Sequence, residues 1–321
     1  MVRGRVASLS APARAACLAL LSLLAACAPQ IAQQGVGSVK PAIERDGFLT
    51  HDGLKLPLRH WDAPAPIAVI VALHGMSDYS NAFDMPATWW AQNGITTYAY
   101  DQRGFGAAPN GGIWPGADAL RGDLTDFVAA ARAKHPGVPV YALGESMGGA
   151  VVLSSLASAR PPNVDGAILV APAVWSRADM PLSYRVALWL TAHTFPGATF
   201  TGKGLKIWPS DNIEMLRKLA HDPLFQHKTR ADQIYGLVDL MDEARHAPEH
   251  LANPPDILFL YGAKDQIIPK EPTEAVIAAL GKRARVKLYP NGYHMLLRDL
   301  EAKKVWTDTL DWIASGRSTT D

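Results

Sequence analysis

The chain has 321 residues, of which 48% are hydrophobic and 19% charged, and its formal net charge is +1. This composition is typical of a globular protein and excludes a disordered or fibrous chain. The basic residues are scattered along the sequence, so the basic patch of a nucleic-acid-binding protein is missing and no such partner is expected.

The first 26 residues have the pattern of a secretory signal. Arg3, Arg5 and Arg14 form a positive leader, and an apolar run of twelve residues follows at positions 15–26. A helix that crosses the bilayer core of about 30 Å needs about 20 residues, so this run is too short to span it. It has the length of the central region of a signal peptide.

The run ends in Leu24-Ala25-Ala26-Cys27, which resembles the lipobox of bacterial lipoproteins. The resemblance implies cleavage before Cys27 and lipidation of its thiol, and several acyl chains would anchor the protein firmly in a membrane. We therefore predict a signal peptide (1–26), a small, polar and flexible tether (27–40) and a lipoprotein of the bacterial cell envelope. The alternatives are an ordinary signal peptide cut after Ala26 or a simple apolar N-terminus.

From residue 41 onward, strand-like and helix-like runs alternate. Continuous apolar, β-branched runs predict strands buried on both faces, and each helical run ends at a Gly or Pro. This alternation predicts an α/β fold with a mostly parallel sheet and helices on both faces, preceded by a β-hairpin around Asp52-Gly53. The expected hairpin arms are 43–49 and 54–61, the strands 67–73, 95–100, 138–143, 167–170, 257–261 and 286–289, and the helices 81–93, 117–135 and 147–159.

About 85 residues separate the strand that ends near position 171 from the one that begins near 257. We predict that a helical cap, at about 172–235, is inserted here into a single domain, 41–321. The cap is rich in bulky apolar residues, and five positions at helical spacing predict an amphipathic helix. Its apolar face could pack on the domain, line an acyl-chain pocket or lie on a bilayer. The five positions are Leu182, Val186, Trp189, Leu190 and His193.

Ser146 is the predicted nucleophile. It lies in Gly144-Glu145-Ser146-Met147-Gly148-Gly149, between an apolar strand and a helix of small residues. A serine in this context occupies a sharp turn with its hydroxyl exposed. The flanking glycines allow close backbone approach, and the N–H groups of the helix N-terminus face developing negative charge.

A serine hydroxyl needs a base, and the base needs a carboxylate that orients it. His294 is the predicted base because it follows a strand, in a turn rich in Asn and Gly. Asp265 is the predicted acid because it follows the strand at 257–261, at the edge where open α/β sheets place their sites. Asp239 and Asp242 compete for this role but fall in a helical stretch. The competing histidines lie in or near the cap: His193, His221, His227, His246 and His250.

The predicted oxyanion hole consists of two backbone N–H groups, those of Met147 and of Met76 in the loop after the strand at 67–73. The neighbouring His74 is expected to be structural. The two cysteines, Cys17 and Cys27, both precede the body, which excludes a disulfide framework and a cysteine nucleophile. With no metal-ligand spacing among the histidines, we predict neither a metal nor a cofactor.

With these motifs placed, the chain resembles the α/β-hydrolase superfamily, and within it the monoacylglycerol lipase and lysophospholipase group, which shares a family with some serine aminopeptidases. The resemblance extends over about residues 41–313 and implies an inserted cap that governs substrate entry. Asp101 and Arg103 are expected to fix a turn. The five motifs are His74-Gly75-Met76, Asp101-Gln-Arg103-Gly104-Phe105-Gly106, the Gly144–Gly149 segment, Gly262-Ala-Lys-Asp265 and Gly292-Tyr-His294.

The sequence therefore predicts a serine carboxylic ester hydrolase that acts on acyl esters or lipids through an acyl-enzyme on Ser146. A serine peptidase or amidase and an acyltransferase remain open, because the same triad serves all three reactions. A non-catalytic, lipid-binding lipoprotein is the alternative of another class. The sequence does not indicate an oligomeric state.

Overall fold

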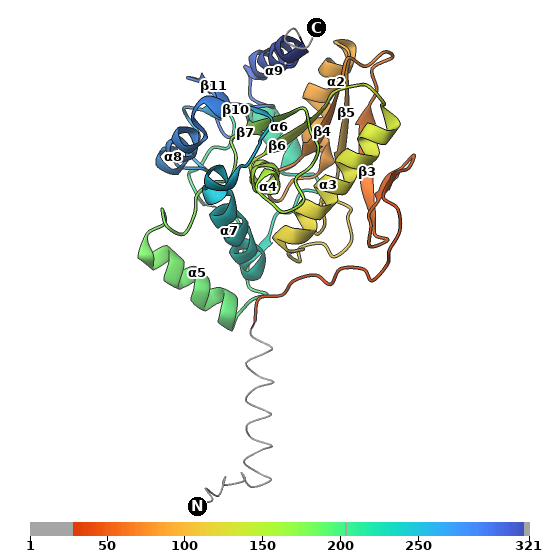
Figure 1. The fold of residues 1–321 in the computed structure, drawn as a ribbon. Helices are drawn as coiled ribbons and strands as arrows, with labels where there is room; N and C mark the ends of the chain where they lie inside the picture. Colours follow the sequence, from red (N-terminus) through yellow and green to blue (C-terminus); the bar gives the residue numbers. More distant parts are fainter. Residues whose placement is uncertain (1–27, 203, 318–321) are drawn as a thin grey trace, which may run out of the picture.

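The computed structural model describes residues 28–202 and 204–317, and a nine-stranded sheet forms its centre (Figure 1). The strand order is β1-β2-β3-β5-β4-β6-β7-β10-β11, and a separate pair, β8-β9, lies in the cap. The strands are β1 (Ala42–Ile43), β2 (Gly47–Leu49), β3 (Lys55–Trp61), β4 (Ala68–Leu73), β5 (Ile95–Tyr100), β6 (Val140–Glu145), β7 (Gly166–Val170), β8 (Thr199–Phe200), β9 (Thr229–Arg230), β10 (Asp256–Gly262) and β11 (Ala284–Tyr289).

The α-helices lie between the strands and cover both faces of the sheet (Figure 1). They are α2 (Asp84–Gln92), α3 (Ala117–Lys134), α4 (Met147–Leu156), α5 (Leu182–Thr194), α6 (Ile213–Leu219), α7 (Ala231–His246), α8 (Lys270–Leu280) and α9 (Ala302–Arg317). Short 3-10 helices occur at Ser80–Phe83, Ala247–His250 and Gly281–Arg283.

The predicted α/β fold is confirmed. The six strands from β5 through β4, β6, β7 and β10 to β11 are all parallel, and β1, β2 and β3 form an antiparallel edge. The predicted hairpin is present as β2 and β3, but its first arm is split into β1 and β2. The predicted helix at 147–159 ends earlier, at Leu156, ahead of Pro161-Pro162.

The side chains of β4 alternate between two core clusters, one on each face of the sheet. Every residue of this strand is buried, and successive side chains point to opposite faces. Val69, Val71 and Leu73 belong to one core cluster, together with residues of α3, α4 and α7. Ala68, Ile70 and Ala72 belong to the other, together with residues of α2 and α9. A continuous apolar run is therefore the sequence that this strand requires.

The cap lies between β7 and the end of β9 and contains α5, β8 and α6. The sequence placed its end at about residue 235, whereas α7, which packs against α4, already begins at Ala231. In Figure 1, α5 lies alongside α7 at the lower left of the molecule.

The segment at 28–40, expected to be a flexible tether, lies against the domain through several hydrogen bonds. Ala32 N–H donates to the carbonyl of Trp114 (2.8 Å), and Gly35 N–H donates to Asp52 (2.8 Å). The predicted signal peptide and Cys27 lie outside the described residues. Within those residues, no helix is long and apolar enough to cross a membrane.

Candidate active site

Ser146 lies at the sharp turn that joins β6 to α4. Its backbone angles, φ +54° and ψ −116°, are unusual for a residue with a side chain and cost about 1–3 kcal/mol, which the surrounding packing must offset. The packing is close because a Cβ on Gly148 would collide with the carbonyl of Leu73. The Ser146 N–H donates to Val170 O (3.0 Å), and its carbonyl accepts from Ala173 N–H (2.9 Å). The predicted strand–turn–helix context of the serine is present.

Asp265 and His294 lie in the loops after β10 and β11 and are hydrogen-bonded. The Asp265 carboxylate is fully buried, with Oδ1 accepting from the Ile267 N–H (2.7 Å) and Oδ2 lying 2.8 Å from His294 Nδ1. Since the carboxylate only accepts, Nδ1 carries the proton, and Nε2 keeps its lone pair for a proton from a nucleophile. A Cβ on Gly262 would lie 2.5 Å from the carbonyl oxygen of Gly292, so that glycine permits the approach of the two loops.

The charge of Asp265 determines the protonation of His294. Burial is the largest single influence and alone would lower the pKa of His294, because it disfavours the charged imidazole. The attraction of the Asp265 carboxylate and the hydrogen bond to it outweigh burial, so the pKa is raised above the ordinary value. The pair has the electrostatics of a base whose imidazolium form is stabilised by its neighbour.

Ser146 follows β6 and His294 follows β11, and the two are not hydrogen-bonded to each other in the described part of the chain. The loops are tied together instead by Arg298, four residues after His294. Its Nη2 lies 3.2 Å from the carboxylate of Glu145, which precedes the serine, and 2.6 Å from Asp78. Catalytic hydrogen bonds are often long before substrate binds and shorten in the complex, so this arrangement is compatible with a triad.

Two backbone N–H groups beside Ser146 have no hydrogen-bond acceptor among the described residues. They belong to Met147, the first residue of α4, and to Met76, in the loop after β4. This loop lies against the serine, because a Cβ on Gly75 would be 3.2 Å from Ser146 Cβ. Free N–H donors at this position are what an oxyanion hole requires.

His74 holds the loop that carries Met76. Its Nε2 accepts the Gln102 N–H at 2.9 Å, so its proton is on Nδ1, which donates to the carbonyl of Gly75 at 2.9 Å. Burial lowers the pKa of His74 and keeps the imidazole neutral. His74 therefore connects the loops after β4 and β5, which is the structural role expected of it.

Asp101 and Arg103 fix the turn after β5. The Asp101 carboxylate accepts the N–H groups of Ser80 and Ala107, both at 2.9 Å. Arg103 is buried and forms paired hydrogen bonds with Asp52 and with Asp123. Both residues therefore act within the fold, as the sequence predicted. No sequence pattern indicated that Asp52 and Asp123 are the partners of Arg103.

The competing candidates lie elsewhere. Asp239 and Asp242 are salt-bridged to Arg177. His193 Nδ1 donates to the carbonyl of Trp189 within α5, and its ring stacks on the Trp189 ring. Among the described residues, no group of three or more His, Cys, Asp or Glu side chains could hold a metal ion.

The cap contacts the loops that carry His294, Asp265 and Met76. Pro209 O accepts the N–H of Met295, next to His294, at 2.9 Å, and Trp208 N–H donates to Gln266, next to Asp265, at 3.0 Å. On the other side, Tyr79 donates to Asp222 of the cap (2.7 Å). The cap is thus fastened to the loops that carry His294, Asp265 and Met76, a set of contacts that the sequence did not predict.

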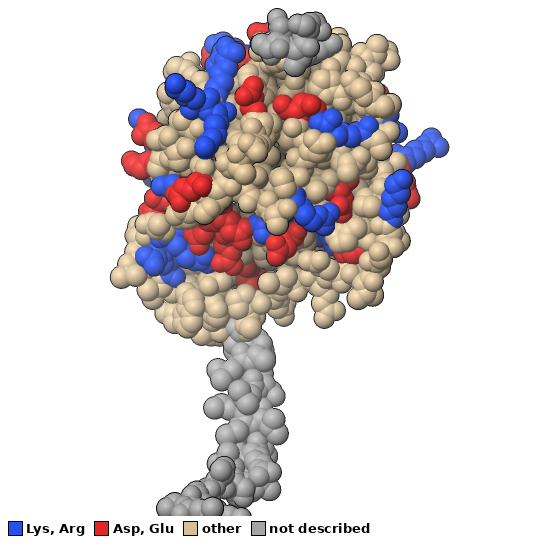
Figure 2. Space-filling view, in the orientation of Figure 1, with Lys and Arg blue, Asp and Glu red and all other residues tan. Residues whose placement is uncertain are grey.

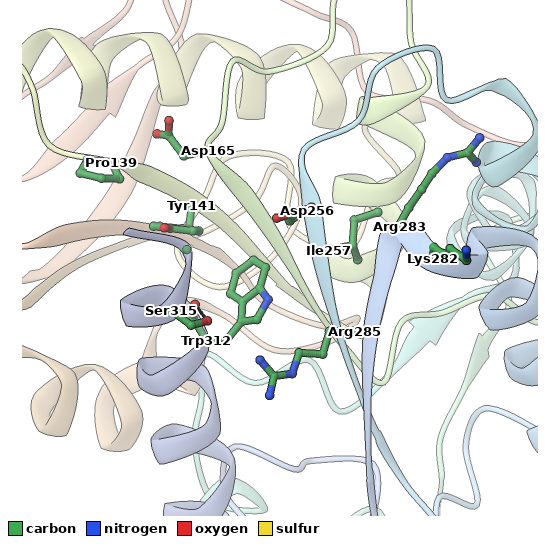
Figure 3. Close-up of a pocket in the computed structure, with 11 residues that line it drawn as sticks. Pro139, Tyr141, Asp165, Asp256, Ile257, Lys282, Arg283, Arg285, Trp312 and Ser315 are labelled. Carbon is green, nitrogen blue, oxygen red and sulfur yellow. Dashed lines mark hydrogen bonds between the residues drawn. The ribbon is translucent and has the colours of Figure 1, made fainter. Parts of the chain in front are cut away.

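A recess of about 530 Å³ lies at the opposite edge of the sheet. Figure 3 shows side chains that line it, among them Tyr141, Arg285 and Trp312. The recess lies where β6 and β10 begin, between Pro139 and Asp256. Open α/β sheets bind their ligands at the C-terminal ends of the strands, so this recess is separate from the candidate active site.

Comparison with known proteins agrees with this geometry. The serine aminopeptidase S33 family model matches residues 64–301. The monoacylglycerol lipase of Mycolicibacterium smegmatis is 27% identical over 260 residues, which cover 78% of this chain and 89% of that protein. The human monoglyceride lipase is 23% identical over 281 residues, which cover 84% and 89%.

Solved structures show the same fold. A soluble variant of the Saccharomyces cerevisiae monoglyceride lipase superposes with a TM-score of 0.72 at 20% identity, covering 90% of this chain and 98% of that one. The Paleococcus ferrophilus monoacylglycerol lipase superposes with a TM-score of 0.67 at 20% identity, covering 81% and 99%. The chain is a hydrolase that belongs to the serine aminopeptidase S33 family and resembles the monoacylglycerol lipases of the α/β-hydrolase fold.

Proposed function

We propose that the chain hydrolyses carboxylic esters of single-chain lipids, such as monoacylglycerols or lysophospholipids, through an acyl-enzyme on Ser146. The observation that carries the proposal is the buried 2.8 Å contact between Asp265 and His294, in loops tied to the strained turn of Ser146. The apolar cap and the names of the relatives support a lipid ester as substrate.

The proposed reaction has two halves. His294 Nε2 takes the proton of Ser146 Oγ as this oxygen attacks the ester carbonyl, and the N–H groups of Met76 and Met147 bind the resulting oxyanion. His294 then gives the proton to the departing alcohol, which leaves an acyl group on Ser146. In the second half His294 takes a proton from a water that attacks this acyl group. The bond from the acyl carbon to Ser146 Oγ then breaks, His294 returns the proton to Oγ, and the fatty acid is released.

Turnover of a panel of p-nitrophenyl esters tests the proposal. Ser146→Ala removes the nucleophile and should reduce kcat by about 10⁶, as in another serine hydrolase. Ser154→Ala is the matched control, because Ser154 lies on the same helix and its hydroxyl donates to the carbonyl of Val151. Turnover by Ser146→Ala comparable to that of the unchanged protein would exclude Ser146 as the nucleophile.

A peptidase or amidase is the second candidate, favoured by the description of the matching family model as serine aminopeptidase. The same residues would then open an amide rather than an ester. Parallel assays with aminoacyl-naphthylamides decide between ester and amide hydrolysis. Turnover of these amides with no turnover of esters would show that the chain is an amidase or peptidase and not an esterase. An unlabelled but folded protein after fluorophosphonate treatment would instead indicate a non-catalytic binder.

We also propose that the protein is a lipoprotein of a bacterial cell envelope, anchored through Cys27. The support is the apolar leader that ends in Leu24-Ala25-Ala26-Cys27. Mass spectrometry of the mature N-terminus tests it, and we expect a chain that begins at an acylated residue 27. A chain with an unmodified thiol at this position would exclude the anchor.

A further inference from the structure

The cap exposes an unusual number of large apolar side chains. Ten of the nineteen exposed large hydrophobic residues in the described ranges fall between Leu182 and Trp208. A soluble monomer seldom gathers its exposed apolar residues in this way, and such a concentration marks a surface that contacts a partner or a membrane.

Most of these residues belong to α5 or follow it closely. Leu182, Val186, Trp189 and Leu190 are 68%, 48%, 52% and 48% exposed. Their spacing places them on one side of the helix, and Arg185 is the only Asp, Glu, Lys or Arg in α5. We call these four residues the α5 stripe. Their exposure shows that the stripe does not pack on the domain.

A different part of α5 holds the helix to the domain. Ala192 is the one buried residue of this helix, and the half-buried Leu188 packs against the main core cluster. His193 shares the side of the stripe but lies at the C-terminal end of the helix, where its ring centroid is 5.2 Å from that of Tyr235 in α7. The helix is therefore already seated through other positions, and the stripe remains available to a partner.

The beginning of the described chain is attached beside the C-terminal end of α5 (Figure 1). Gln30 N–H donates to Asp232 (3.3 Å), and Arg230 donates to the Gln30 side chain (2.9 Å). The same short stretch of β9 and α7 holds the chain that leaves α5, because Asp232 N–H donates to Pro196 O (3.1 Å). Residue 30 and the end of α5 are thus fixed to one site on the domain.

This attachment limits where a lipid anchor can enter a membrane. Gln30 is three positions after Cys27, and a fully extended chain covers at most about 3.6 Å per position, or roughly 11 Å in all. An acyl group on Cys27 would therefore enter a bilayer close to the C-terminal end of α5. In the view of Figure 2 the lower rim, where α5 lies, is largely without charged side chains.

We propose that the α5 stripe, together with Phe195 and Phe200, lies on a lipid bilayer, and that the anchor at Cys27 fixes the protein in this orientation. Phe195 and Phe200 are 69% and 48% exposed and extend the apolar surface beyond α5. A helix of this kind buries its apolar face about 5–10 Å into the boundary between headgroups and acyl chains. The proposal rests on the proposed lipid anchor.

Tryptophan fluorescence tests the orientation. The full chain is reconstituted into phosphatidylcholine vesicles whose acyl chains carry bromine, which quenches tryptophans in contact with them, and is compared with unbrominated vesicles. Trp189→Phe should abolish most of the quenching. Trp89→Phe is the matched control, because Trp89 lies on α2, away from α5 (Figure 1), and this variant should retain the quenching.

Other outcomes overturn the proposal in recognisable ways. Equal quenching in the unchanged protein and Trp189→Phe would show that the stripe does not contact lipid. A change of oligomeric state in Leu190→Ser without vesicles, with quenching as in the unchanged protein, would assign the stripe to a second copy of the chain. The ester assay and the mass spectrum of residue 27 are read separately, so loss of either proposed function is distinguished from loss of this orientation.

Discussion

The guanidinium of Arg298 lies 3.2 Å from the carboxylate of Glu145, the residue directly before the candidate nucleophile. The same nitrogen lies 2.6 Å from Asp78, so one cation serves two carboxylates from two other loops. All three side chains are buried, and burial raises the pKa of Glu145. The site thus depends on a buried ionic cluster that does not take part in the proposed reaction.

Arg298→Met should destabilise the fold severely. Methionine is apolar and of similar length, so the substitution leaves Asp78 and Glu145 buried without their cation. Such a loss typically costs about 3–5 kcal/mol. Urea unfolding measures the loss. Arg285→Met is the control, since Arg285 is exposed on β11 and its loss should change the free energy of unfolding by less than about 0.5 kcal/mol. Equal unfolding midpoints for the two variants would show that the cluster contributes little.

The pH dependence of ester hydrolysis should report the Asp265–His294 pair. The base must be neutral to accept a proton, so kcat/KM should fall as the pH drops through the pKa of His294. Because this pKa is raised, the midpoint of the acid limb should lie above the ordinary value of 6.5. Measurement of kcat/KM from acid to neutral pH gives this midpoint.

Asp265→Asn tests the cause of that shift. It removes the charge and the hydrogen bond that raise the pKa of His294, so the acid limb should move to lower pH. In another triad enzyme the corresponding change lowers kcat by about 10⁴, and a loss of that order is expected here. His193→Asn, in the cap, should leave both the midpoint and kcat unaltered. An acid limb that stays in place in Asp265→Asn would assign it to a different group.

Local sequence patterns determined what could be predicted of this molecule. The position of Ser146 follows from a buried strand, a tight turn and a helix that are consecutive in the chain, so a short stretch of sequence is enough to predict it. The cluster around Arg298 has no such pattern, because Arg298 and Asp78 are 220 residues apart and meet only through the sheet order.

The sequence also did not predict which way the α5 stripe faces. Helical spacing shows that four apolar residues share a side of a helix, but it does not show whether that side faces the domain or the solvent. The answer depends on the packing of Leu188 and Ala192 against the domain, which is set only when the cap is assembled. The attachment of Gln30 to Arg230 likewise depends on side chains 200 residues apart.

Gly148→Ala should destabilise the protein through overpacking. A Cβ at this position would collide with the backbone of β4 at Leu73, which cannot rotate away, so the cost should reach about 3 kcal/mol. Gly111→Ala is the matched control, because nothing lies within 4 Å of a Cβ there and its φ is not in the left-handed region. The control should be neutral or slightly stabilising. Thermal unfolding distinguishes them, and similar melting temperatures would show that the turn around Ser146 can relax.

Tyr79→Phe should loosen the cap on the oxyanion loop. The substitution removes the 2.7 Å hydrogen bond to Asp222 of the cap and leaves the aromatic ring in place. Tyr289→Phe is the matched control, since Tyr289 donates a similar 2.8 Å bond to Asp308 but does not contact the cap. Each variant should lose roughly 1 kcal/mol of stability.

Only the cap contact should affect the kinetics. With the cap less firmly held over the loops of Met76 and His294, the substrate is less well positioned, so Tyr79→Phe should raise KM severalfold and change kcat little. Tyr289→Phe should keep both constants. Steady-state kinetics with one ester measures this difference. Identical KM values in the two variants would mean that two backbone hydrogen bonds, from Met295 N–H to Pro209 O and from Gln226 N–H to Ser77 O, fix the cap without Tyr79.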